Sequence, residues 1–587
     1  MIRSLTLSLF LLASTASAQS LVHVRVETPD ASSLGESLLN EGYDVLEGSI
    51  TSSKFELVLS DPEFEALTRR GLDLQLIARG RPFNDIQAEQ EIPVGYSDLQ
   101  GILDAMALTA ANFPDIAELV DLTARYGMPT TAEGRNIFAM KISDNVTLDE
   151  DEPSSLLVSA HHCREIVNPV IAMHGIDQLT SLYGIDPTVT SAVDENEIWI
   201  VPVWNVDGYN EVFVGNNLWR KNRRVLPGGI GVDLNRNYPF GWDTPCSGST
   251  VVSSQTYKGP SAASEVETLT MIAFGNDRRF SRVVDLHSSG REVLYGFLCN
   301  SSPLTTYWLD RAVGLATGAG YAGSTRPPTA EGENYQWHIA QGALSFLIET
   351  HTTFQPTFAS AEAEANLVWP GIFSLFTSPI PLTGHVQDAC TGDPLVAALT
   401  VDAFPFQAGE VVESGGPFGR YDYFLPRGNT TIRFDASGFD TAAVATGIPP
   451  VGTTTEEFAL AADVQFSTTG TLQIGTTTQF NFDSLSDANQ FYVTLISISG
   501  TSPGTPLNNC TLPINIDSTS LYAIDLKPVF KKFIGVLDGS GMATGNFIIP
   551  NDPTLVGAAV DFAYFTADTT TGLAIHASDA LSVQIQP

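Results

Sequence analysis

The 587-residue sequence predicts an α/β fold, with a mixed, mostly parallel sheet covered by helices, preceded by a small α+β module and followed by β-sandwich domains. Three observations support this prediction. Apolar runs of strand length alternate with helical patterns between residues 92 and 380. Strand-like and helix-like segments also alternate over residues 19–91. After residue 380, short alternating runs rich in Thr and Gly dominate.

The first 18 residues have the features of a secretory signal peptide. Arg3 precedes an apolar run over residues 5–12, and Ala16-Ser17-Ala18 fits a cleavage site before Gln19. This run is shorter than the ~20 residues that a spanning helix needs, and no later stretch is long and apolar enough. We therefore expect a secreted protein, extracellular or periplasmic, without a membrane span.

Residues 19–91 form the first predicted module. Strand-like runs occupy residues 21–26 and 55–59, and Leu34, Leu38 and Leu39 recur at helical spacing between them. The stretch 79–85, which contains Gly, Pro and Asn, has the composition of a linker.

Residues 92–380 form the predicted α/β domain. Ser97 is the expected N-cap of its first helix, whose apolar face includes Leu99, Ile102 and Met106. Four apolar runs suit buried strands: residues 155–159, 198–203, 283–286 and 344–348. The helical stretches between them indicate a mostly parallel, covered sheet.

Two β-rich segments follow, at residues 381–462 and 463–587. Alternating runs such as 431–434 and 491–496 are typical of strands. We expect these segments to form one or two β-sandwiches.

The composition excludes some classes of function. With 29 Lys and Arg against 66 Asp and Glu, the formal charge is −37, so the chain lacks the basic surface of a general nucleic-acid binder. Hydrophobic residues make up 43% of the chain, which argues against disorder. The acidity fits either solubility in a salty or extracellular medium or an acidic recognition surface.

The five cysteines are too few for a disulfide framework. Cys246 and Cys299 fall in the same predicted domain and are the pair that we expect to bridge, if any does. Because the number is odd, at least one of the five stays free or is modified. Cys163, Cys390 and Cys510 are the others.

Three residues at strand ends have the chemistry of zinc ligands. His162 and Glu165 follow the run 155–159 and are three residues apart, so one turn can aim both at one point. His287 ends another apolar run, at the carboxyl edge where open α/β sheets place their sites. Three protein ligands plus water is typical of catalytic zinc. The His162/Glu165 pair alone is weak evidence, and a solvated charged turn is the alternative.

Glu349 and two arginines extend this candidate site. Glu349 terminates the run 344–348 and could act as a general base, with a buried salt bridge as the alternative. Arg220 and the Asn235-Arg236 pair offer donors suited to a terminal carboxylate, with a solvated basic loop as the alternative.

From residue 92 to 380 the sequence resembles the zinc carboxypeptidase family, the carboxypeptidase A/B-like metallopeptidases. The resemblance rests on seven segments in the family's order: His162-Cys163-Arg164-Glu165, Asn205-Val206-Asp207-Gly208-Tyr209, Trp219-Arg220-Lys221-Asn222-Arg223, Val232-Asp233-Leu234-Asn235-Arg236-Asn237, Tyr257-Lys258-Gly259-Pro260 with Ser264-Glu265, Leu286-His287-Ser288 and Phe346-Leu347-Ile348-Glu349.

The resemblance implies a metallocarboxypeptidase-like fold and one Zn²⁺ per chain, held by His162, Glu165 and His287. It also implies that Asp233 orients His162 from behind. The substrates would be peptides or proteins with a free C-terminus, from which the last residue is released.

The same resemblance implies roles for the remaining residues. Glu349 would move a proton from the zinc water to the leaving amine, and Arg220 would stabilise the oxyanion. Asn235 and Arg236 would bind the substrate's terminal carboxylate, with Arg164 assisting.

Two features depart from the family's pattern. The tyrosine that often covers the bound substrate has no counterpart in register over residues 323–334, although Tyr321 and Tyr335 flank this stretch. Counting back from Glu349 places Glu333 near the selectivity position, where an acidic residue would favour Lys or Arg ends.

The flanking segments have weaker resemblances. Residues 21–80 are similar to carboxypeptidase pro-segments, with Arg69-Arg70, Arg79 and Arg81 as cleavage points, and a non-inhibitory accessory module is the alternative. Residues 381–462 resemble a transthyretin-like β-sandwich. Residues 463–587 resemble no family that we can name.

The leading hypothesis is therefore a secreted zinc metallocarboxypeptidase. A zinc amidase that trims cell-wall peptides and a non-catalytic binding protein on a peptidase fold are the alternatives. The sequence leaves open the preferred C-terminal residue, the substrate, the oligomeric state, the removal of residues 19–91 and the role of residues 463–587.

Overall fold

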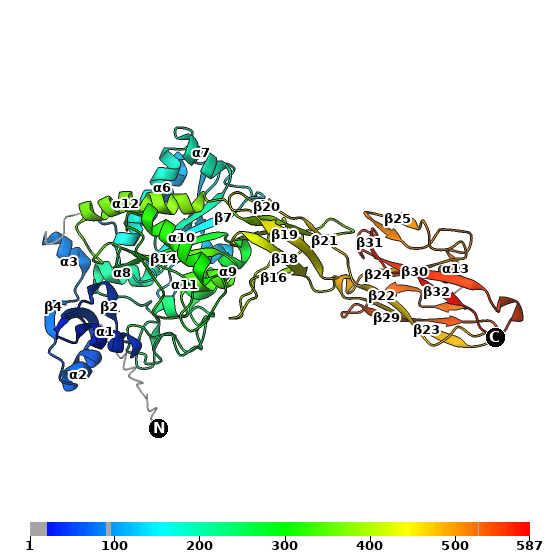
Figure 1. The fold of residues 1–587 in the computed structure, drawn as a ribbon, viewed down its shortest axis with the longest axis horizontal. Helices are drawn as coiled ribbons and strands as arrows, with labels where there is room; N and C mark the ends of the chain where they lie inside the picture. The colour runs from blue at the N-terminus through cyan, green and yellow to red at the C-terminus, as the bar shows by residue number, and fades with distance from the viewer. Residues whose placement is uncertain (1–19, 90–94, 526–527) are drawn as a thin grey trace, which may run out of the picture.

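The computed structural model describes residues 20–89, 95–525 and 528–587, so the predicted signal peptide lies outside the described residues. The molecule is elongated (Figure 1). The α/β domain and the N-terminal module lie at one end, and the β-rich segments extend to the other. No helix within the described ranges combines the length and apolar character needed to cross a membrane.

The N-terminal module is a four-stranded antiparallel sheet with its own hydrophobic core. Alternation along β1 places Val22, Val24 and Val26 in that core. Helix α2 begins with a capping box between Ser60 and Glu63. The elements are β1 (Leu21–Glu27), α1 (Ala31–Asn40), β2 (Val45–Leu46), β3 (Lys54–Ser60), α2 (Asp61–Arg69) and β4 (Gln75–Arg79).

The stretch expected to form a linker is folded against the α/β domain instead. Helix α3 (Phe83–Ala88) follows β4 almost directly, and its Phe83 is fully buried. The Phe83 ring packs edge-on against the rings of Tyr96 and Phe213. The two buried apolar residues of α3, Phe83 and Ile86, explain this docking, because they belong to the hydrophobic core of the α/β domain.

The α/β domain is built on an eight-stranded mixed sheet in the order β13-β12-β14-β11-β7-β8-β6-β5. The four central strands β14, β11, β7 and β8 are parallel, and β6 and β5 continue the sheet antiparallel. The strands are β5 (Ala117–Asp121), β6 (Phe138–Ile142), β7 (Ser154–Ser159), β8 (Glu197–Val201), β11 (Arg282–Ser288), β12 (Glu292–Leu294), β13 (Thr325–Arg326) and β14 (Leu344–Thr350).

Strands β7, β8 and β11 are buried along their whole length, as their continuous apolar sequences predict. Helix α4 begins one residue later than expected, because the side chain of Asp98, not Ser97, accepts the Gly101 N–H at 2.9 Å. The helices are α4 (Leu99–Asn112), α5 (Leu122–Arg125), α6 (Val167–Ser181), α7 (Pro187–Asp194), α8 (Val206–Val214), α9 (Val266–Arg278), α10 (Thr305–Gly318), α11 (Asn334–Ala340) and α12 (Phe358–Phe376). A short hairpin, β9 (Val225–Leu226) with β10 (Gly229–Ile230), lies outside the sheet.

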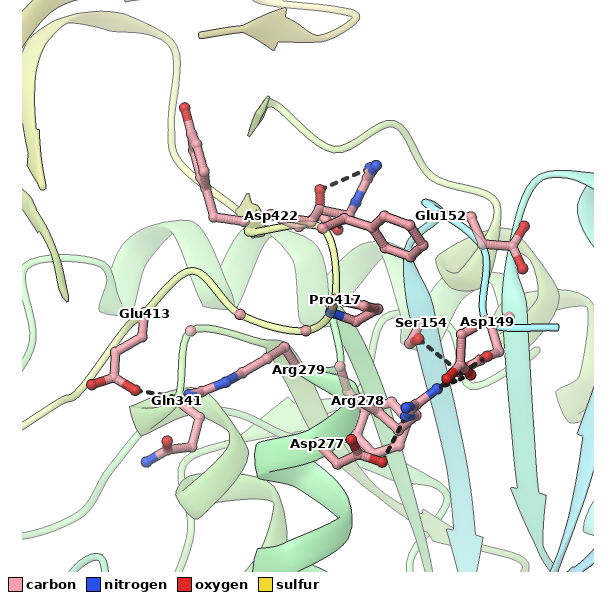
Figure 2. A pocket seen from close by; sticks show the side chains of 18 of the residues that line it. Asp149, Glu152, Ser154, Asp277, Arg278, Arg279, Gln341, Glu413, Pro417 and Asp422 are labelled. Atoms are coloured by element: carbon pink, nitrogen blue, oxygen red, sulfur yellow. Dashed lines mark hydrogen bonds and ion pairs between the residues drawn. The ribbon is translucent and has the colours of Figure 1, made fainter. Parts of the chain in front are cut away.

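The first β-rich segment shares the hydrophobic core of the α/β domain. It consists of β15 (Leu382–Asp388), β16 (Ala398–Val401), β17 (Arg420–Tyr423), β18 (Gly428–Asp435), β19 (Ala442–Ile448), β20 (Thr454–Thr455) and β21 (Phe458–Leu460). Figure 2 shows the seam between the two parts, where Arg279 donates to Glu413 at 2.7 Å. Arg420 of the β-rich segment forms a second ion pair across this seam, 3.3 Å from Asp151. The β-rich segment is therefore fixed to the domain by both apolar packing and ion pairs.

The second β-rich segment has separate hydrophobic cores. Its strands are β22 (Val464–Thr469), β23 (Thr477–Ser484), β24 (Phe491–Ser497), β25 (Thr505–Leu507), β26 (Cys510–Leu512), β27 (Phe530–Lys531), β28 (Ile534–Val536), β29 (Met542–Ile548), β30 (Ala559–Ala567), β31 (Ala574–Ala577) and β32 (Leu581–Gln584), with α13 (Tyr522–Asp525) among them.

Two disulfides cross-link the chain. The predicted Cys246–Cys299 bridge is confirmed. A second bridge, Cys390–Cys510, was not predicted and joins the two β-rich segments. Cys163 is free and fully buried.

Candidate metal centre and active site

The candidate site lies at the carboxyl edge of the central parallel strands. β7 ends at Ser159, and the turn that follows carries His162 and Glu165 to the start of α6. β11 pairs in parallel with both β7 and β14, and its register places His287 directly opposite Glu349. The parallel pairing therefore brings together residues that are far apart in the sequence, as predicted.

His162, Glu165 and His287 converge on one point. Nδ1 of His162 lies 3.0 Å from Oε1 of Glu165 and 3.0 Å from Nδ1 of His287. Nδ1 of His287 lies 3.3 Å from the other oxygen of Glu165. All three side chains are buried, and together they could hold a metal ion.

This donor set fits zinc. Ligand atoms bound to one tetrahedral zinc at roughly 2 Å lie about 3.3 Å from each other, close to the spacing seen here. The set also has the neutral nitrogens and anionic oxygen of catalytic zinc sites. Nε2 of each imidazole faces a carboxylate, Asp233 for His162 and Asp285 for His287, so the two Nδ1 atoms present lone pairs to each other at 3.0 Å, and a shared cation would satisfy both.

Asp233 lies behind His162, on the side away from these ligands. It caps the 3₁₀ helix η2 (Leu234–Arg236), and its Oδ1 lies 3.1 Å from Nε2 of His162. Its other oxygen accepts two hydrogen bonds from Arg220, at 3.0 and 2.8 Å. Burial alone would raise the pKa of Asp233, but Arg220 and His162 hold it well below its usual range. Asp233 is therefore placed to orient His162 as an anion.

The ionisation of the site follows from its buried charge pairs. Burial opposes the charged form of Glu165, yet His162 and His287 hold its pKa below the usual range. Burial also opposes the charge on Arg220, but Asp233 and Asp44 raise its pKa above the ordinary value. The site is thus a cluster of mutually stabilised charges.

Glu349 lines the same small cavity, of about 60 Å³, as the three candidate ligands. Arg220, Asn235 and Arg236 line it too, so the residues singled out in the sequence are brought together. The amide nitrogen of Asn235 lies 3.2 Å from Nε2 of His287.

The predicted selectivity residue, Glu333, also lines the cavity. Its Oε1 accepts a hydrogen bond from Arg236 at 2.8 Å, and it caps helix α11. Arg326 lies in the same lining and donates to Glu292 at 2.8 Å. The cavity therefore contains a fourth guanidinium, besides those of Arg164, Arg220 and Arg236, and sequence reasoning did not identify it.

No tyrosine lines this cavity among the described residues. Tyr321 is buried and donates to Glu364 at 2.7 Å. Tyr335 is fully buried, and its hydroxyl donates to the Gly296 carbonyl at 3.1 Å. The flanking tyrosines are therefore engaged in the core, in agreement with the departure noted in the sequence.

The N-terminal module inserts Asp44 into the site. Arg164 donates to both oxygens of Asp44, at 2.5 and 2.8 Å, and Arg220 lies 3.7 Å from it. Asp44, Val45 and Leu46 line the cavity with the candidate catalytic residues. Burial would raise the pKa of Asp44, but Arg164 and Arg220 lower it.

Sequence reasoning missed Asp44, His161 and Asp285. Asp44 has no local signal, because its role depends on how two modules pack. His161 and Asp285 lie together behind His287, with His161 Nδ1 3.0 Å from Asp285 Oδ1. A signal existed for Asp285, since residues two apart on a strand share a face.

Residues 102–364 match the family model described as zinc carboxypeptidase. This part of the chain is therefore similar to the zinc carboxypeptidase family. A zinc carboxypeptidase of Saccharothrix mutabilis subsp. capreolus is 31% identical over 234 residues, 37% of this chain and 51% of that protein. Carboxypeptidase B of Canis lupus familiaris is 28% identical over 266 residues, 43% of this chain and 63% of that protein. The chain thus spans between half and two thirds of these relatives.

The fold comparison extends beyond the matched residues. The crystal structure of carboxypeptidase A from Helicoverpa armigera superimposes with a TM-score of 0.51 at 22% identity. The match covers 61% of this chain and 96% of that protein. At this identity the likeness establishes a shared fold.

Proposed function

We propose that the protein is a secreted zinc metallocarboxypeptidase, which hydrolyses the C-terminal peptide bond of peptides or proteins. The observation that carries the proposal is the convergence of His162, Glu165 and His287 in one cavity with Glu349 and Arg220. A binding protein has no need of a general base beside a zinc site. The match of residues 102–364 to the zinc carboxypeptidase family model supports the same conclusion.

Each residue of the cavity has a role in this proposal. Zinc, when bound by His162, Glu165 and His287, polarises the scissile carbonyl and lowers the pKa of a water. Glu349 accepts a proton from the attacking water and delivers it to the leaving amine. Arg220 donates hydrogen bonds to the oxygen that becomes negatively charged as the peptide bond breaks.

Two arginines are suited to the substrate's terminal carboxylate. Arg236 and Arg164 line the cavity near Glu349, and a guanidinium binds a carboxylate through two parallel N–H donors. Arg164 already makes such a pair with Asp44. We infer that the Asp44 carboxylate stands where a substrate carboxylate would bind.

This inference favours the pro-segment hypothesis for the N-terminal module. With Asp44 in place, a substrate must displace a buried, two-point ion pair before it can reach Arg164. We propose that residues 20–79 inhibit the enzyme until they are removed or displaced.

The test is release of C-terminal residues from blocked peptides ending in Lys, Arg, Phe, Leu or Glu, with the N-terminal module removed by limited proteolysis. We expect release that a zinc chelator abolishes and added zinc restores. A preference for Lys or Arg ends would support the role of Glu333 in selectivity. No release from any peptide, by a zinc-loaded and processed chain, would refute the proposed function.

A further inference from the structure

A second group of potential ligands lies directly behind the candidate zinc site. It consists of His161, Asp285 and His287, all buried. Oδ1 of Asp285 lies 3.0 Å from Nδ1 of His161 and 3.3 Å from Nε2 of His287. The His161 ring is stacked on that of His287, with centroids 5.9 Å apart and planes 17° apart.

Because this group shares His287 with the candidate zinc ligands, the two groups cannot both bind a metal ion through that residue. A neutral imidazole has one lone pair and one N–H. Nδ1 of His287 faces Glu165 and His162, whereas Nε2 faces the Asp285 carboxylate at 3.3 Å and the side-chain amide of Asn235 at 3.2 Å, and of these two only the carboxylate can accept a proton. If Nδ1 binds the metal, Nε2 carries the proton and needs an acceptor, which Asp285 provides.

The remaining atoms of the second group are already engaged. Nε2 of His161 lies 2.9 Å from the hydroxyl of Tyr238. Oδ2 of Asp285 accepts a hydrogen bond from the side-chain amide of Asn334 at 3.1 Å. His161 and Asp285 are thus each held by a residue outside the group, which suits a fixed support better than a second metal site.

We propose that Asp285 is a positioning residue for zinc binding, and that His161, Tyr238 and Asn334 hold it in place. Asp285 accepts the Nε2 proton of His287 and so directs the Nδ1 lone pair toward the metal. His162 has the equivalent partner in Asp233. Each imidazole ligand therefore has its own buried carboxylate.

The two carboxylates differ in what balances their charge. Asp233 is paired with Arg220. No Lys or Arg of the described residues lies within 4.0 Å of Asp285, whose ion-pair partners there are His161 and His287. The support of His287 thus depends on the His161–Tyr238 arm, and weakening that arm should loosen zinc binding.

The test measures zinc affinity on the full chain, by competition with a chelator, and the visible absorption spectrum of the cobalt-substituted protein. We expect Asp285→Asn to weaken zinc binding by about 10- to 100-fold, the usual effect of removing such a partner. The stoichiometry should remain one metal per chain, and the cobalt spectrum should shift. Tyr238→Phe should act in the same direction but more weakly.

Glu267→Gln is the matched control, because Glu267 is also a buried carboxylate but lies outside the cavity. If Asp285→Asn and Tyr238→Phe both behave like this control, the proposal is wrong. If Glu165→Gln binds zinc normally while Asp285→Asn binds none, the metal lies in the second group and the proposal is overturned. Should Asp285→Asn not fold, Tyr238→Phe decides between these outcomes.

This inference rests on the zinc site of the proposed function, but the two can fail separately. A chain whose zinc affinity depends on Asp285, yet which releases no residue from any peptide, would refute the proposed activity and support the positioning role. A chain that binds no zinc at all would refute both.

Discussion

Arg220 is the cation that lies between two buried carboxylates of the site, Asp233 and Asp44. It donates twice to Asp233 and lies 3.7 Å from Asp44, so one guanidinium connects the support of His162 to the inserted N-terminal module. Because Asp233 fixes one end of Arg220, its remaining donors are held in place before substrate arrives. A donor held in this way is effective in stabilising developing charge.

The first prediction concerns this donor. We expect Arg220→Met to lower kcat of the processed enzyme by about 10²- to 10³-fold, with a smaller change in KM, because the lost interaction forms only as the bond breaks. Zinc content should be unchanged. An equal fall in zinc content and activity would instead assign Arg220 a purely structural role through Asp233.

The second prediction concerns Asp44. We expect Asp44→Asn to raise the peptidase rate of the unprocessed chain by about tenfold or more, because Arg164 loses its charged partner and binds substrate carboxylate instead. Glu36→Gln is the control, since Glu36 is an exposed carboxylate of the same module. If both variants remain as inactive as the parent, Asp44 does not block the site.

At the scale of elements, the N-terminal module contains two arginine-bearing segments that a protease could cut, the turn after α2 and the segment after β4. The two differ in how firmly they are held by the rest of the chain. The turn after α2 is exposed, and Gly71 has a positive φ with open space around it. Gly80, which follows β4, lies in close contact with the side chain of Asn216. The Arg81 N–H donates to the side-chain oxygen of Asn217, and the Arg81 carbonyl accepts from the Asn217 N–H. Strand β4 is extended and exposed, but its main chain pairs with β1 and the residues after it are bonded to Asn217, so a protease can bind this second segment only after it undocks.

The third prediction follows. We expect trypsin to cut after Arg69 or Arg70 well before it cuts after Arg79 or Arg81, as mass spectrometry of a time course would reveal. Residues 20–70, which include Asp44, would then be held without a covalent link. The double variant Arg69→Gln, Arg70→Gln should resist this first cut. First cleavage after Arg79 would mean that the docked segment opens readily.

The central elements were predictable because their sequence signals are local. The apolar runs ending at Ser159 and Ile348 fall within β7 and β14, and the parallel pairing of such strands explains why His287 meets Glu349. The N-cap of α4 was misplaced by one residue, since Ser97 and Asp98 are adjacent and both are good caps. Local patterns do not decide between such neighbours.

Features that depend on packing between segments were not predictable. The linker expected at residues 79–85 is docked because Phe83 fits the core of another domain, which composition does not reveal. Arg326 reaches the cavity from a two-residue strand that has no distinctive pattern. Asp44 acts only through its contact with Arg164, far along the chain.

At the scale of the whole molecule, the two β-rich segments are joined by a disulfide and by one buried histidine. Near the Cys390–Cys510 bridge, His576 lies 2.6 Å from Asp388 and 2.8 Å from Asp487, which belong to different segments. Burial would lower the pKa of His576, but the two carboxylates raise it to about 9. The charged imidazole thus holds the segments together.

The fourth prediction is a pH dependence of this junction. Because the pKa of His576 is raised on folding, its stabilising contribution is complete below about pH 6.5 and is lost as pH rises through about 9. We expect the unfolding temperature of the β-rich part to fall over that range in calorimetry. His576→Gln should flatten this dependence, and an unchanged slope in that variant would exclude the histidine as its cause.

The central claim is that Glu349 and the adjacent metal centre hydrolyse C-terminal peptide bonds. Its most direct test is the rate of C-terminal residue release by the processed, zinc-loaded enzyme, compared with Glu349→Gln and with the exposed control Glu362→Gln. We predict that Glu349→Gln lowers kcat by about 10²- to 10⁴-fold while zinc content stays constant, and that the control matches the parent. Release that persists unchanged in Glu349→Gln would contradict the account.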